Sequence, residues 1–224
     1  MIQENFVATP PAQSAVGLSR PDSVAAIVIV LVLGLLIGLS IYAQSPPHAE
    51  PVGIAPSSFS AERALRNLSV IAAKPHPSGS AAQEEVRDYL MRELKAAGFQ
   101  PQIQHSILFK PNQGAPPSGI QNVLARLKGT GNGRAILLVA HYDSVNGSFG
   151  ASDDGSSVAT LLETARTLKA GEPLKNDVIF LFTDAEETGS LGAQVFVAEH
   201  DWARDVGLAL NFESRGNTGP VIMF

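Results

Sequence analysis

Residues 134–141 read RAILLVAH, a continuous apolar run that ends at a histidine. Such a run is typical of a strand that a parallel sheet buries on both faces. Two further apolar runs follow, DVIFLFT at residues 177–183 and VGLALNF at residues 206–212, and we expect both to be buried strands. The amphipathic pattern SSVATLLETARTLKAG predicts a helix between the first two runs. Strands alternating with helices predict an α/β fold with a mixed, largely parallel sheet flanked by helices.

The same alternation extends upstream to residue 59. SAERALRNLSVIAAK and AAQEEVRDYLMRELKAAG both carry apolar residues at helical spacing, with Ser60 as an N-cap and Gly98 as a C-terminal stop. Two strand-like stretches follow, QPQIQHSILF and IQNVLARLKG. The sequence therefore predicts one domain over residues 59–224.

An uncharged apolar segment precedes this domain. Residues 24–43, VAAIVIVLVLGLLIGLSIYA, are long enough to cross a hydrocarbon core of ~30 Å. A core helix would show a polar face, and a cleaved signal peptide has a shorter apolar region, so we favour an uncleaved, single-pass anchor. We expect a disordered tail at residues 1–23, a Pro-rich linker at residues 44–58 and an extracytoplasmic domain.

Bulk composition excludes several kinds of partner and site. The chain has 16 Lys and Arg against 21 Asp and Glu, a formal net charge of −5 and no basic cluster, which argues against nucleic-acid binding. Cysteine is absent, so a bound metal would need His, Asp and Glu as ligands.

Acidic residues and one histidine follow the apolar runs. They are His141 and Asp143 after the first run, Asp153 and Asp154 before the helix, Glu186 and Glu187 after the second run, and Glu213 after the third. In open α/β sheets, ligands bind beyond the carboxyl ends of the strands. Clustered carboxylates repel one another unless cations neutralise them, and this ligand set suits Zn²⁺ or Mn²⁺.

Each motif taken singly has an ordinary explanation. HYD is commonly a loop with a solvated acid, ASDDGS is a normal helix start capped by Ser152 or Asp154, and paired glutamates are often solvated. Glu213 could pair with Arg215. These explanations weaken jointly, because a single sheet would bring all four motifs together.

HYDSVNGSFGASDDGSS, FTDAEETGSLGA and NFES together resemble the two-zinc aminopeptidases of metallopeptidase family twenty-eight. FSAERALRNLSVIAAKPHPSGS is similar to the membrane-bound branch of that family, which has endoplasmic-reticulum and vacuolar-membrane members. The resemblance covers about residues 59–224. It implies a membrane-anchored, zinc-dependent exopeptidase, an aminopeptidase acting on peptides, with two zinc ions in a complete site.

The resemblance also implies a role for each residue of the cluster. His141 and Glu213 would bind one zinc, Glu187 would bind the other, and Asp153 would bridge the two. Asp143 would orient His141. Glu186 would be the general base, because a glutamate engaged with zinc has little basicity left.

Three departures from the family pattern stand out. Ser157 replaces a glycine, and Ser190 stands where leucine is common. The family's distant histidine ligand has no match before Phe224, so we expect the N-terminal part of a longer enzyme, with poor binding of two metals and little activity by itself.

Other functions stay open at this point. A non-catalytic receptor-like or scaffold domain on the same fold would be expected to lose ligands or the base, and a single-zinc glutaminyl cyclase-like acyltransferase would differ in its metal count. A calcium-type binding module lacks support, because there is no EF-hand-like loop. Substrate specificity, the choice between amino- and carboxypeptidase, and the oligomeric state are not given by the sequence.

Overall fold

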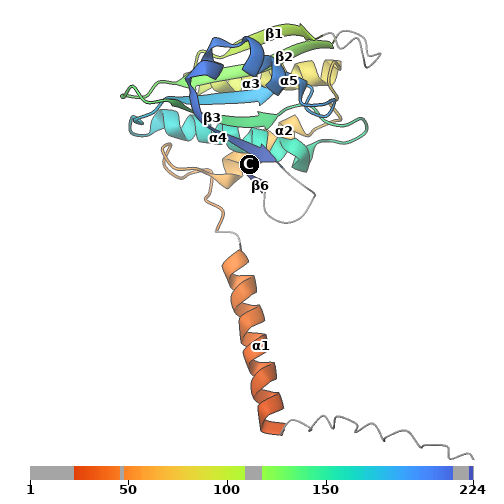
Figure 1. Cartoon of the computed structure of the whole chain (residues 1–224), viewed down its shortest axis with the longest axis vertical. Coiled ribbons are helices and arrows are strands. Elements are labelled where there is room, and N and C mark those ends of the chain that lie inside the picture. Colours follow the sequence, from red (N-terminus) through yellow and green to blue (C-terminus); the bar gives the residue numbers. More distant parts are fainter. Residues whose placement is uncertain (1–22, 46–47, 109–117, 214–221, 224) are drawn as a thin grey trace, which may run out of the picture. The chain divides into compact units, whose positions relative to one another are not determined.

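Figure 1 shows the computed structural model, which describes residues 23–45, 48–108, 118–213 and 222–223. The chain divides into two compact units, Met1–His48 and Ala49–Phe224. The tail predicted for residues 1–23 lies outside the described residues except for Ser23.

Helix α1 (Ser23–Gln44) is the one element described in the first unit. Its mean hydropathy of 3.1 and its 22 residues make it long and apolar enough to cross a membrane. In the described part of the chain it is the single helix that meets this criterion.

The second unit is built on a six-stranded mixed sheet in the order β1-β2-β4-β3-β5-β6. Its strands are β1 (Gln102–Leu108), β2 (Ser118–Leu127), β3 (Ala135–His141), β4 (Val178–Thr183), β5 (Val206–Glu213) and β6 (Ile222–Met223). β3 runs parallel to β4 and β5, and the other pairs are antiparallel. The predicted mixed α/β sheet is confirmed, with its parallel pairs confined to the three central strands.

Helices cover both faces of this sheet. They are α2 (Ala61–Ile71), α3 (Ala81–Ala96), α4 (Ser156–Ala170) and α5 (Leu191–Glu199), with short helical turns η2 (Ala151–Gly155) and η3 (Asp201–Asp205). Successive strand residues point to opposite faces. On β4, Phe180 and Phe182 therefore pack in the cluster that holds residues of α2, α3 and α4, while Ile179 and Leu181 pack with Phe196 of α5.

Both upstream helices begin at a serine cap, of which Ser60 was predicted from the sequence and Ser80 was not. Ser60 accepts a hydrogen bond from the backbone N–H of Arg63 at the start of α2, and Ser80 accepts one from Gln83 at the start of α3. Gly98 follows α3 with φ of +84°, a conformation that favours glycine. The predicted cap at Ser60 and stop at Gly98 are confirmed.

One strand is less buried than the sequence predicts. All six residues of β4 are buried, but Leu208 of β5 is 52% exposed and its neighbours Gly207 and Ala209 are also exposed. Among the described residues, β5 pairs with β3 along one side, whereas β6 pairs only with Phe212 and Glu213. The first half of β5 is therefore an edge, which explains why its apolar residues remain accessible.

A segment inside the predicted linker is hydrogen-bonded to the helices. Arg63 of α2 donates to the carbonyl oxygens of Val52 and Ser58 at 2.6 Å each, and Arg166 of α4 donates to that of Pro56 at 2.7 Å. The buried carboxylate of Glu163 accepts from both guanidinium groups, at 2.9 and 2.7 Å. We call residues 50–58 the strap, because this ion-pair cluster fixes it to the domain.

Candidate metal centre

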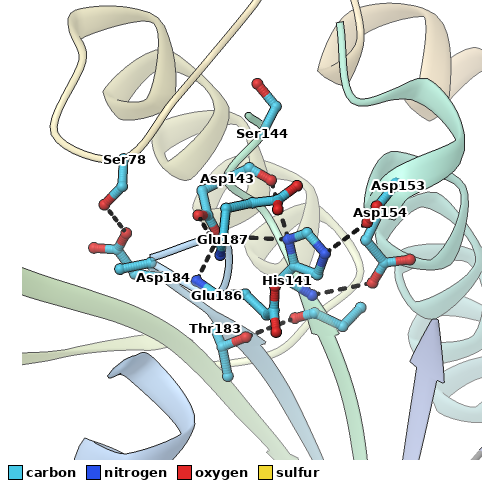
Figure 2. Close-up of polar contacts among 12 residues, drawn as sticks. Ser78, His141, Asp143, Ser144, Asp153, Asp154, Thr183, Asp184, Glu186 and Glu187 are labelled. Atoms are coloured by element: carbon cyan, nitrogen blue, oxygen red, sulfur yellow. Dashed lines mark hydrogen bonds and ion pairs between the residues drawn. The ribbon is translucent and has the colours of Figure 1, made fainter. Parts of the chain in front are cut away.

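Figure 2 shows the polar side chains at the edge of the sheet where the central parallel strands end. His141, the last residue of β3, is in register with Thr183, the last residue of β4. Glu213 ends β5, on the other side of β3. The fold therefore brings the carboxyl ends of all three strands to the same edge of the sheet.

Three of the predicted metal ligands form one compact group. His141 Nε2 is 3.0 Å from Asp153 Oδ1 and 3.7 Å from Glu213 Oε1. One candidate ligand atom from each residue lies within 4.8 Å of the others. Nitrogen and oxygen atoms gathered this closely can share one small divalent cation. Glu187, the fourth predicted ligand, is not a member of this group.

The His141 ring is held by the loop that follows it. Its Nδ1 lies 3.0 Å from the backbone carbonyl oxygen of Asp143, an acceptor, so Nδ1 carries the proton. Nε2 is then the atom that faces Asp153 and Glu213. A hydrogen bond of this kind fixes both the tautomer and the orientation of a metal-binding imidazole.

Asp143 does more than the sequence suggests. Its carboxylate, 1% exposed as a residue, accepts hydrogen bonds from the backbone N–H groups of Glu186 at 3.0 Å and Glu187 at 3.2 Å. Its Oδ1 is also 3.4 Å from His141 Nδ1. One buried carboxylate therefore ties the loop after β3 to the loop after β4, as Figure 2 shows.

Asp154 does not cap helix α4, which was one ordinary explanation of the ASDDGS motif. Helix α4 begins after Gly155 without a side-chain cap, and Asp154 Oδ2 instead accepts the backbone N–H of His141 at 3.1 Å. Asp154 Oδ1 and Ser157 Oγ are buried without hydrogen-bond partners among the described residues. Burial raises the pKa of the Asp154 carboxyl to about 8.

The electrostatics of the group favour a bound cation. Burial lowers the pKa of His141, but the hydrogen bond to Asp143 and the surrounding negative charges outweigh it and raise that pKa to about 10. Burial and the charge of Asp153 raise the pKa of Glu187. Protonation of the imidazole and of a carboxylate is how such a cluster lowers its charge without a metal, so the residues present fit a divalent ion.

The turn after β4 is held by a residue that the sequence did not single out. The buried carboxylate of Asp184 accepts from Ser78 Oγ at 3.0 Å, Gln83 Nε2 at 2.5 Å and the backbone N–H of Gln121 at 2.8 Å. These partners come from two segments far apart in the sequence, the start of α3 and strand β2. The motif TDAEE contains three acids within five residues, but no sequence pattern distinguishes the buried acid from the two at the site.

A cavity of about 280 Å³ adjoins the metal group on the α5 side of the sheet. Its polar lining residues are His141, Thr183, Glu186, Ser190 and Asn211, and its apolar ones include Leu137, Val139, Leu181 and Phe196. Glu186 is therefore accessible from a partly apolar space beside His141.

Residues 122–224 match the family model described as "Peptidase family M28". The vacuolar membrane protease of Candida albicans strain WO-1 is 38% identical over 165 residues, which cover 73% of this chain and 19% of the relative. The vacuolar membrane protease of Yarrowia lipolytica is 32% identical over 231 residues, covering 91% of this chain and 23% of the relative. The chain thus spans about a fifth of the length of these curated relatives.

Solved structures share the fold. Glutaminyl cyclase from Porphyromonas gingivalis has a TM-score of 0.61 at 26% identity, and the match covers 70% of this chain and 60% of the cyclase. A Zn-dependent exopeptidase from Parabacteroides distasonis has a TM-score of 0.62 at 24% identity, and the match covers 73% of this chain and 64% of the exopeptidase. An aminopeptidase from Aneurinibacillus sp. strain AM-1 has a TM-score of 0.62 at 14% identity, covering 71% of each chain.

Proposed function

Because residues 122–224 belong to peptidase family M28, we propose that this chain carries part of the active site of a zinc-dependent exopeptidase, an aminopeptidase, that acts on peptides. The observation that carries the proposal is the group of His141, Asp153 and Glu213, whose candidate ligand atoms lie within 4.8 Å of one another. The turn with Glu186 and Glu187 is tied to the same loop by Asp143.

In this proposal the cluster would bind two zinc ions. His141 and Glu213 would hold one ion, Glu187 would hold the other, and Asp153 would contribute to both. A bound zinc ion polarises the scissile carbonyl group and lowers the pKa of a coordinated water. The raised pKa of Glu187, caused by burial and by the charge of Asp153, supports a cation at the second position.

Glu186 is the proposed general base. Its backbone is fixed by Asp143, and its side chain lines the cavity next to His141. From there it can accept the proton of the attacking water and deliver it to the leaving amine. Glu187, engaged with a cation, has less basicity available for the same task.

A pair of variants tests the proposed roles of Glu186 as general base and Glu187 as metal ligand. In the zinc-loaded full-length protein, Glu186→Gln should abolish hydrolysis of aminoacyl arylamides, while the zinc content, measured by elemental mass spectrometry, stays unchanged. Glu187→Gln, the matched control, should lose part of the zinc. If Glu186→Gln loses zinc and Glu187→Gln retains it, the two roles are assigned the wrong way round.

A second candidate function is acyl transfer by a glutaminyl cyclase-like enzyme, which the fold similarity to several solved glutaminyl cyclases favours. Such an enzyme would cyclise N-terminal glutamine and release ammonia instead of hydrolysing a peptide bond. Ammonia release from a glutaminyl peptide, together with one zinc per chain, would decide for this alternative.

We also propose that α1 anchors the protein in a membrane with the second unit outside the cytoplasm, in keeping with the names of the vacuolar relatives. Asn146 lies exposed in an Asn-Gly-Ser sequence, a potential acceptor for an N-linked glycan. A gain in electrophoretic mobility on endoglycosidase treatment, absent from Asn146→Gln, would place the domain in the lumen. Resistance of the domain to protease in sealed vesicles provides an independent measurement.

A further inference from the structure

Ser190 makes a hydrogen bond to the carboxylate of Glu186. Its Oγ donates to Glu186 Oε1 at 2.8 Å, and both side chains line the cavity of about 280 Å³ beside His141. The hydroxyl therefore touches one of the two oxygens that could act as the base.

The backbone between these residues is closed into a tight turn. The carbonyl oxygen of Glu186 accepts from the N–H groups of Gly189 at 2.8 Å and Ser190 at 2.7 Å. Downstream, the N–H of Gly192 donates to the carbonyl oxygen of Asp184 at 2.9 Å. Ser190 is thus held against Glu186 by its main chain as well as by its side chain.

Neither the backbone nor helix α5 explains why a serine stands here. Ser190 has φ of +54° and ψ of +40°, the left-handed region that favours glycine. Serine at the start of a helix ordinarily accepts a bond from a helix N–H, but Ser190 makes no such cap. Its hydroxyl is directed to Glu186 instead, in a backbone conformation that serine rarely adopts.

We propose that Ser190 is a positioning residue for Glu186. By binding Oε1, it restricts the rotation of the carboxylate and leaves Oε2 available to accept a proton from the attacking water. This inference rests on the proposed function, in which Glu186 is the general base. A base that is already oriented loses less freedom on reaching the transition state, so the gain falls on kcat and not on substrate binding.

Three substitutions in the zinc-loaded full-length protein separate positioning from structural support. Ser190→Ala should lower kcat about tenfold with KM and zinc content within twofold of wild type, the effect expected for one hydrogen bond to a charged group. Ser190→Gly should lower kcat to the same extent but keep or raise the melting temperature, because glycine suits φ of +54°. Ser190→Asn, which tolerates this backbone and carries an N–H donor, should recover part of the loss.

The outcomes are distinguishable. Wild-type kcat in Ser190→Gly, with Glu186→Gln inactive, overturns the role of Ser190 and leaves the proposed function intact. Normal turnover by Glu186→Gln overturns the proposed base, and the inference about Ser190 with it. The bond itself is tested without activity by a thermal double-mutant cycle of Ser190→Ala and Glu186→Ala in metal-free protein, where coupled effects support it and additive effects contradict it.

Discussion

Replacing Asp143 with asparagine should both destabilise the domain and weaken zinc binding. The Asp143 carboxylate accepts the N–H groups of Glu186 at 3.0 Å and Glu187 at 3.2 Å. An asparagine side chain has a single carbonyl oxygen, so one of these N–H groups would face an amide NH₂ and lose its acceptor. Losing one hydrogen bond to a charged group costs about 1.5–3 kcal/mol, and an unpaired buried N–H adds to that. We therefore expect a loss of about 3 kcal/mol in the free energy of unfolding.

Urea denaturation of the metal-free protein measures this loss, with the fluorescence of the single tryptophan as the probe. Asp88→Asn is a matched control, because the Asp88 side chain is 58% exposed and, in the described part of the chain, its ion pair is with the neighbouring Arg87; its effect should stay within about 0.5 kcal/mol. Zinc affinity of Asp143→Asn should fall about 10–100-fold, as expected when a residue that supports a ligand is altered. Wild-type stability together with wild-type zinc affinity would refute the reasoning.

Three further changes probe other parts of the account. Gly192→Ala should lower the free energy of unfolding, measured by urea denaturation, by about 3 kcal/mol, because the added Cβ would clash with the side-chain oxygen of Asn122. Wild-type stability would show that the start of α5 can shift. Glu163→Gln weakens the ion pairs with Arg63 and Arg166, so it should lower the free energy of unfolding by about 2 kcal/mol and make the strap sensitive to limited proteolysis. Glu85→Gln, which removes an exposed ion pair, should have neither effect. Since the pKa of His141 rises from 6.5 to about 10 on folding, metal-free protein should lose stability as pH rises through that window. His141→Gln should lack this loss above the pKa of about 8 of the buried Asp154 carboxyl, which contributes a loss of its own below that pH; equal pH profiles would count against the charge assignment.

The sequence predicts the central strands well because a buried strand is marked by a continuous apolar run within the strand itself. Continuous apolar runs identify β3 and β4, and the residue type that ends each run identifies the edge at which polar groups gather. The exposure of Leu208 was not predictable in this way, since it depends on which neighbour β5 pairs with and over what length.

The candidate site also combines features that the local sequence predicts with features that depend on tertiary contacts. Residue types and their positions after the strands pointed to a group of polar residues, and the family resemblance implied four of them as metal ligands. The structure brings three of these four together, namely His141, Asp153 and Glu213. The contacts that position His141 and Glu186 could not be predicted from the sequence. There, Asp154 resembles an ordinary helix cap and Ser190 resembles a neutral substitution. Their hydrogen bonds to the backbone of His141 and to the side chain of Glu186 depend on tertiary placement.

We propose that His141, Asp153 and Glu213 hold a zinc ion at the carboxyl end of the sheet. An anomalous difference map from crystals of the zinc-loaded protein, collected on both sides of the zinc edge, tests this proposal. We expect a peak about 2.0–2.2 Å from His141 Nε2 and from a carboxylate oxygen of both Asp153 and Glu213. A zinc peak bound by other residues, or no peak in protein that retains zinc in solution, would contradict it.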